Sequence, residues 1–86
     1  MFTVIVTKPA TKELKKIDTR YQEAIKKRLK ELEIDPLAGK KLHDNLKNYR
    51  SIREGVYRII YKVINEKLIV YVISIDHRQG VYKNRR

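Results

Sequence analysis

The sequence contains no cysteine and no tryptophan, and it has only two histidines, His43 and His77. Without cysteine the chain can form neither a disulfide framework nor a thiolate metal site. Two histidines are too few for a convincing zinc site without cysteines. No apolar run approaches the roughly 18 residues that a membrane-spanning helix requires. We therefore expect no metal, no other cofactor and no membrane.

The chain is 86 residues long, which is enough for one modest hydrophobic core and not two. We therefore expect residues 1–86 to form a single domain. The N-terminal segment has its short apolar run before its lysines, which is the reverse of the order in a secretory signal. This predicts a cytoplasmic protein.

Acidic residues are scarce, with 10 against 21 lysines and arginines, and the formal net charge is +11. The excess is spread along the chain, because residues 1–48 carry 12 basic and 7 acidic side chains and residues 49–86 carry 9 and 3. A basic domain of this kind favours a polyanionic partner, first a nucleic acid or a ribosome. An acidic protein or an anionic membrane surface ranks second, and a merely solubilising lysine-rich surface is the remaining interpretation.

The hydrophobic pattern changes period halfway along the chain. The β-branched run Phe2–Thr7 predicts a strand, and the segments KPATKELKKID and TRYQEAIKKRLKELE have the three- and four-residue apolar spacing of two helices. Residues 36–48 read as a loop, and three strands are expected near 49–54, 56–63 and 67–75. The predicted fold is α+β, an antiparallel sheet packed by an N-terminal helical hairpin in the order β-α-α-β-β-β.

The register of the first hairpin decides where its arginines point, because strand side chains alternate between faces. A two-residue turn at Glu54-Gly55 or at Gly55-Val56 puts Arg53 and Arg58 on one face. A three-residue turn would instead bury Arg53 among tyrosine and isoleucine side chains, which is costly for a charge. The two-residue turn is therefore favoured. Guanidinium groups suit phosphate oxygens, so the pair is either an anion site or an ordinary solvated face.

The segment ISIDHRQGVY follows the most apolar run in the chain and contains further groups able to bind phosphate or move protons. Tyr82 could stack on a base or exchange a proton, with Arg78 lowering its pKa and stabilising a phosphorane. The alternative is an aromatic clamp that packs the C-terminal tail. His77 could be a general base or structural, and Asp76 could orient His77 or Arg78. The apolar run itself predicts a central strand covered on both faces.

The stretches LKNYRSIREGVYRIIYKV and VISIDHRQGVYK resemble the RelE/ParE superfamily of bacterial and archaeal toxins. The resemblance covers nearly the whole chain and is closer to the RelE branch, whose members cut mRNA in the ribosomal A site. Members of the ParE branch share the fold and poison DNA gyrase. A third interpretation is a module that binds RNA or the ribosome without catalysis.

The resemblance implies a metal-independent endoribonuclease, an mRNA interferase, in which the 2′-hydroxyl of the RNA attacks the adjacent phosphate. By position, Arg58 would hold the scissile phosphate, and Arg78 would stabilise the transition state or protonate the leaving oxygen. Tyr82 would stack on or activate the nucleotide, and Arg53 matches a basic residue of the preceding strand. Several family members have two alternating basic residues on that strand, whereas this chain has Ser51 at one such position.

Further contacts with RNA phosphates are expected from Arg50 and from lysines on the outer helical face, which are Lys26, Lys27 and Lys30. The resemblance also implies a partner, since family members are made with an antitoxin that wraps and neutralises the toxin. We therefore expect an acidic, RelB-like antitoxin, with the ribosome and mRNA as the other partners.

Overall fold

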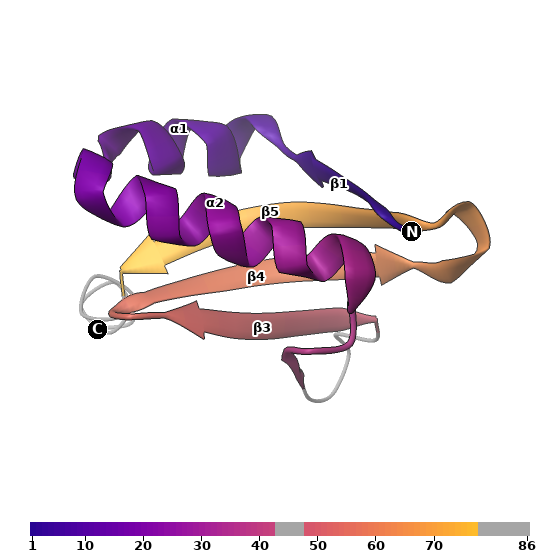
Figure 1. Ribbon diagram of the computed structural model, residues 1–86. Helices are drawn as coiled ribbons and strands as arrows, with labels where there is room; N and C mark the ends of the chain where they lie inside the picture. Colours follow the sequence, from indigo (N-terminus) through magenta and orange to yellow (C-terminus); the bar gives the residue numbers. More distant parts are fainter. Residues whose placement is uncertain (43–47, 78–86) are drawn as a thin grey trace.

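The computed structural model describes residues 1–42 and 48–77 (Figure 1). The elements are β1 (Thr3–Val6), α1 (Lys8–Lys16), α2 (Thr19–Ile34), β2 (Lys40–Lys41), β3 (Tyr49–Glu54), β4 (Tyr57–Ile64), the 3-10 turn η1 (Asn65–Lys67) and β5 (Ile69–His77). Figure 1 shows both helices on one face of the sheet. This confirms the predicted α+β architecture, to which the structure adds the short strand β2 within the expected loop.

The two helices are separated by a cap rather than by a long loop. Ile17, which follows α1, is extended, and Asp18 then caps α2 because its carboxylate accepts a hydrogen bond from the backbone N–H of Arg20 at 2.9 Å. That bond, and then the Arg20 side chain, hold the pKa of Asp18 below its ordinary value. The helices therefore form the hairpin that their apolar spacing predicted.

The sheet has the strand order β1-β5-β4-β3-β2, and it is mixed rather than wholly antiparallel. Strand β1 runs parallel to β5, pairing Thr3 with Ile69 and Val6 with Val72. A parallel pair needs a crossover connection, and the chain between these strands includes both helices and the β3–β4 hairpin. Strand β5 thus lies between β1 and β4, which confirms that the apolar run forms a central strand.

Two strand boundaries differ from the expected ones. The predicted strands 56–63 and 67–75 are observed as Tyr57–Ile64 and Ile69–His77. The connection is a 3-10 turn that ends at Leu68, which adopts a left-handed conformation with φ of 54°. Because this turn occupies residues 65–68, β5 begins later than the apolar pattern indicated.

A β-bulge in β5 changes which side chains face the helices. Ile60 pairs with Ser74 and Tyr61 pairs with Val72, so Ile73 is the extra residue. Val70 and Val72 are buried before the bulge, and Ile75 is buried after it. The bulge thereby leaves Ile75 in the core and puts Ser74 and Asp76 on the opposite face.

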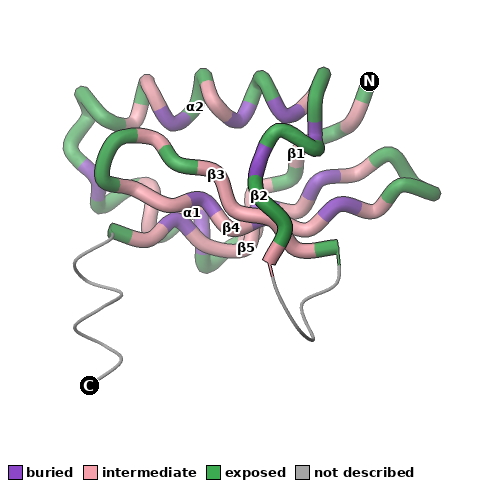
Figure 2. Tube along the Cα trace, turned by 90° about the horizontal axis from the view of Figure 1, so that it is seen from below, coloured by how far each residue is buried: buried purple, intermediate pink, exposed green. Residues whose placement is uncertain are grey.

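The core lies between the helical layer and the sheet. Figure 2 shows buried and half-buried residues alternating along the strands. The buried apolar side chains are Ala10, Ile17, Ile25, Leu29, Leu32, Ile59, Tyr61, Val63, Val70, Val72 and Ile75. The other sheet face carries the remaining strand residues, and the candidate site is found there. Within residues 1–42 and 48–77, no helix is long and apolar enough to cross a membrane.

Candidate nucleic-acid interface

The β3–β4 hairpin has a two-residue turn at Gly55-Val56, with Arg53 paired directly opposite Arg58. Gly55 has a φ of 62°, in the left-handed region that hairpin turns of this length require and that glycine adopts without strain. Of the two turns that the sequence allowed, the structure has the one in which the arginines face each other. The prediction that they share a face is confirmed.

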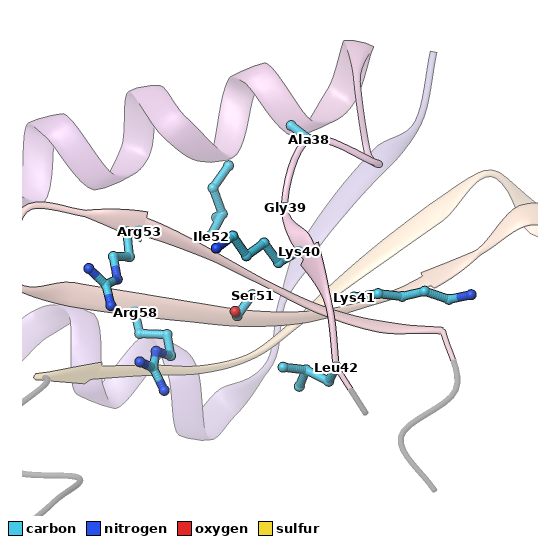
Figure 3. A pocket seen from close by; sticks show the side chains of 9 residues that line it. All are labelled: Ala38, Gly39, Lys40, Lys41, Leu42, Ser51, Ile52, Arg53 and Arg58. Carbon is cyan, nitrogen blue, oxygen red and sulfur yellow. The ribbon is translucent and has the colours of Figure 1, made fainter. Parts of the chain in front are cut away.

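Arg53 and Arg58 lie on the sheet face opposite the helices. Their neighbours Ile52 and Ile59 also pair across the hairpin and point toward the helical layer, where Ile59 is fully buried. Figure 3 shows the two arginine side chains close together, reaching away from the helix. They border an open hollow of about 570 Å³ lined by Ala38, Gly39, Lys40, Lys41, Leu42, Ser51, Ile52, Arg53 and Arg58.

The facing arginines are not neutralised by an ion pair within the described part of the chain, where the ion pairs join Asp18 to Arg20 and Arg28 to Glu31 and Glu54. The carboxylate nearest in register is Asp76, which pairs with Arg58 across β4 and β5. Asp76 instead accepts a hydrogen bond from the Ser74 hydroxyl at 3.3 Å. The guanidinium donors of both arginines are therefore available to an anion, which a phosphate would satisfy.

Arg50 occupies a different environment from the facing pair. Its guanidinium donates hydrogen bonds to the carbonyl oxygens of Gly39 at 2.7 Å and Leu37 at 3.3 Å. These bonds hold the segment that precedes β2 against β3. They give Arg50 a structural role, and its contact with RNA stays a prediction.

Tyr61 is a site residue that the sequence analysis did not identify. Its buried hydroxyl donates a hydrogen bond to the carbonyl of Pro36 at 2.8 Å and accepts one from the backbone N–H of Gly39 at 2.9 Å. Burial raises the pKa of this hydroxyl, so it remains protonated. The available signal was a tyrosine on the core face of β4, since a buried phenol needs a polar partner.

The close packing at Tyr61 explains the glycine at position 39. A Cβ atom at Gly39 would lie 2.6 Å from both the Ser51 carbonyl oxygen and the Tyr61 hydroxyl oxygen. No side chain fits there unless the backbone shifts. Tyr61, Gly39 and Arg50 thus fix the segment that leads into β2 along one side of the hollow.

The remaining predicted residues lie apart from the arginine pair or outside the described residues. Lys26, Lys27 and Lys30 are exposed on α2, which covers the opposite face of the sheet. Arg78 and Tyr82 lie outside the described residues, as does His43. The structure therefore brings together Arg53 and Arg58 and separates them from the helix lysines.

His77 ends β5 within an aromatic cluster. Its ring packs edge-on against Tyr57 with ring centroids 5.3 Å apart, and Tyr57 also packs against Tyr21 of α2 at 5.9 Å. These contacts anchor the end of the central strand to the helical layer. In the described ranges, no group of three or more His, Asp or Glu side chains is placed to hold a metal ion.

Comparisons with known proteins agree with this fold. The family model described as the ParE toxin of type II toxin–antitoxin systems matches residues 4–82. The toxin RelG of Mycobacterium tuberculosis is 32% identical over 95% of this chain and 97% of its own length. The mRNA interferase toxin RelE of Escherichia coli is 38% identical over 81% of this chain and 76% of its own.

Solved structures give the same result. The RelBE2 toxin–antitoxin complex of Mycobacterium tuberculosis contains a chain that matches with a TM-score of 0.82 and 33% identity, covering 90% of this chain and 98% of that one. The intact Escherichia coli RelBE complex matches with a TM-score of 0.78 and 31% identity, covering 87% and 94%. The chain belongs to the RelE/ParE superfamily of type II toxin–antitoxin toxins, and to its RelE-like branch.

Proposed function

We propose that this toxin is a ribosome-dependent endoribonuclease that cuts mRNA in the ribosomal A site. The observation that carries the proposal is the Arg53–Arg58 pair, which faces an open hollow on the uncovered side of the sheet. A relative with 38% identity, named an mRNA interferase, supports the same activity. Two guanidinium groups converging on one face suit a phosphate backbone better than an apolar ligand.

The proposed reaction uses the RNA as its own nucleophile. The 2′-hydroxyl oxygen bonds to the adjacent phosphorus as it gives up its proton, the bond from phosphorus to the 5′ oxygen breaks, and that oxygen gains a proton. The products are a 2′,3′-cyclic phosphate and a 5′-hydroxyl. Since this displacement needs no metal, fixed positive charges must stabilise the pentacoordinate phosphorane.

In this mechanism Arg58 holds the scissile phosphate and Arg53 adds a second fixed charge beside it. Neither residue serves as the base, because a guanidinium does not give up its proton at working pH. By their positions in the family motif, Arg78 stabilises the transition state or protonates the leaving oxygen, and Tyr82 stacks on or activates the nucleotide. The ribosome supplies the rest of the alignment, so free RNA should be cut poorly.

We propose a cytoplasmic protein neutralised by an acidic, RelB-like antitoxin. The solved relatives include toxin–antitoxin complexes, and the net charge of +11 suits an acidic partner. A strand added to a sheet edge or a helix laid in a groove would provide the contact.

Expression in cells followed by primer extension on a known transcript tests the activity. The proposal predicts codon-phased breaks that disappear in Arg58→Ala, Arg78→Ala and Tyr82→Phe. The family model carries the ParE description, so inhibition of DNA gyrase is the second candidate. DNA damage without mRNA breaks would establish gyrase inhibition, and growth unaffected by the wild-type chain would indicate a module without catalysis.

A further inference from the structure

Lys40 was assigned to a loop by its sequence, but the structure places it on an edge strand beside the arginine pair. Strand β2 pairs antiparallel with β3, with Lys40 opposite Ser51 and Lys41 opposite Arg50. Residues opposite each other on paired strands point to the same face of a sheet. Lys40 therefore shares the face of Ser51, Arg53 and Arg58, and all four line the same hollow.

Lys41 has the same charge and the opposite orientation. It pairs with Arg50, whose side chain turns back to the backbone before β2. Figure 3 shows the Lys40 side chain extending toward the side where Arg53 and Arg58 lie, while Lys41 extends away from it. Both lysines border the hollow, but only the Lys40 side chain extends toward the arginine pair, which makes Lys41 a matched control for charge without that direction.

The backbone that carries Lys40 is held in place before any ligand binds. Gly39, its immediate neighbour, donates its N–H to the Tyr61 hydroxyl at 2.9 Å, and its carbonyl accepts from Arg50 at 2.7 Å. Binding through Lys40 then orders only an exposed side chain and not a loop. A group held in this way loses less entropy on binding than one on an unfixed segment.

We propose that Lys40 is a third phosphate-contacting residue of the hollow and binds a backbone phosphate next to the one held by Arg58. This inference rests on the proposed function. Ser51 and Arg53 are two residues apart on β3, a separation of about 7 Å along a strand. Because this exceeds the size of one phosphate group, Lys40 reaches a neighbouring phosphate. Its partner is therefore the single-stranded RNA that crosses the hollow over Ser51.

The test compares Lys40→Ala with the matched control Lys41→Ala and with Lys40→Arg. The probe is a ribosome programmed with a short mRNA whose A-site codon carries 2′-O-methyl groups, so that the RNA binds without being cut. Lys40→Ala should weaken toxin binding roughly tenfold, as expected for one lost charge-assisted contact. Lys40→Arg should retain most of the affinity, and Lys41→Ala should stay within about twofold of wild type.

A second readout is salt dependence. Removing one phosphate contact from a single strand should reduce the slope of log affinity against log salt by about 0.7. The slope should fall for Lys40→Ala and not for Lys41→Ala. Since both side chains are exposed, the variants should melt at the wild-type temperature, which is checked by circular dichroism.

The failures of the two proposals are distinguishable. Equal affinities and equal salt slopes for Lys40→Ala and Lys41→Ala would overturn the assignment of Lys40, even if the wild-type toxin cuts unmodified mRNA. A wild-type toxin that binds the programmed ribosome but cuts no mRNA would overturn the proposed function. The role of Lys40 in binding would still be decided by the comparison of affinities. A wild-type toxin that does not bind would overturn both.

Discussion

At the scale of single residues, the site is defined by two like charges that face each other across the β3–β4 hairpin. Arg53 and Arg58 are paired in register and have no ion-pair partner among the described residues. Facing like charges destabilise a strand pair by a few tenths to about 1 kcal/mol. A bound phosphate between them would remove this repulsion, so the arrangement favours the complex over the free protein.

Replacing Arg53 by Gln should therefore separate stability from function. Arg53→Gln removes the repulsion and should raise the free energy of unfolding by a few tenths to about 1 kcal/mol, while it slows mRNA cleavage. Arg50→Gln is the control, because it removes two hydrogen bonds to carbonyls and should cost about 1 kcal/mol. Urea denaturation measures both values. A loss of stability in Arg53→Gln as large as in Arg50→Gln would contradict the explanation.

Arg58 should matter more for chemistry than for folding. Arg58→Ala should lower the single-turnover rate of mRNA cleavage by about 100- to 1000-fold, the usual cost of removing one transition-state donor. Arg58→Lys should recover part of the rate, because it restores the charge but not the bidentate fork. Rates are measured on programmed ribosomes at saturating toxin. An Arg58→Ala protein with the wild-type rate would remove this residue from the mechanism.

The positions of single side chains were predictable wherever successive residues of a strand simply alternate between the two faces of the sheet. A two-residue turn was enough to bring Arg53 and Arg58 to one face, because the other register would bury a charge. Alternation fails in β5, where the bulge at Ile73 changes the phase and aligns Asp76 with Arg58. A bulge depends on packing between strands and leaves no local signal in the apolar run.

At the scale of elements, the segment from Pro36 to Lys41 decides the shape of the hollow. The sequence indicated a loop there, because Pro36 and Gly39 break a helix. The hydrogen bonds that turn its end into β2 come from Tyr61 and Arg50, which are distant in sequence. Contacts of this range cannot be read from local pattern, which is why Lys40 and Tyr61 were missed.

Tyr61→Phe should loosen this segment. The substitution keeps the ring in the core but leaves the Gly39 N–H and the Pro36 carbonyl without their partner, at a cost of about 1–3 kcal/mol. Thermal and urea denaturation measure this loss. Tyr61→Phe should also weaken toxin binding. Because part of this effect acts through Lys40, the loss of affinity should be smaller when the same substitution is made in a Lys40→Ala background. Additive losses would show that Tyr61 acts on binding independently of Lys40.

The Tyr61 hydroxyl should also make the stability of the folded protein depend on pH in the alkaline range. Burial raises the pKa of Tyr61 above its ordinary value of 10.0, so the folded state holds this proton more tightly than the unfolded state. The stabilisation is fully present below the unfolded-state pKa and is lost as pH rises through the folded-state pKa. The stability difference between wild type and Tyr61→Phe should therefore be constant from about pH 7 to 9 and shrink above about pH 10. A difference that grows at alkaline pH would contradict the assignment.

At the scale of the whole molecule, basic side chains occupy both sides of the sheet. The arginine pair and Lys40 lie on the uncovered face, and Lys26, Lys27 and Lys30 lie on the outer surface of α2. The net charge of +11 thus has contributions on both sides of the sheet. This arrangement suits the proposed function, in which the toxin enters a cavity walled by ribosomal RNA and holds mRNA on one face.

Neutralising the α2 lysines should change binding without changing chemistry. Replacing Lys26, Lys27 and Lys30 by Gln should weaken ribosome affinity and reduce its salt slope by about 2 to 3, for three lost phosphate contacts on structured RNA. The cleavage rate at saturating toxin should remain that of the wild type. An unchanged affinity would show that this face does not contact RNA, and a reduced rate would place the lysines in the chemistry.

The fold and family were predictable at this scale because several independent patterns agreed. Helical spacing in the first half, β-branched alternation in the second and the R-x-G-x-Y-R motif all pointed to one architecture, which the TM-score of 0.82 to a relative confirms. The parallel pairing of β1 with β5 was not predicted, because the position of the first strand depends on how the helical hairpin crosses the sheet.

Cleavage of one mRNA on and off the ribosome, followed by analysis of the product ends, tests the central proposal most directly. We expect cleavage in the A-site codon of the programmed ribosome, with 2′,3′-cyclic phosphate and 5′-hydroxyl ends, little cleavage of the free RNA, and loss of activity in Arg58→Ala. Equal cleavage of free RNA would contradict ribosome dependence. Intact mRNA on the ribosome, together with inhibition of DNA gyrase by the same preparation, would contradict the proposed function itself.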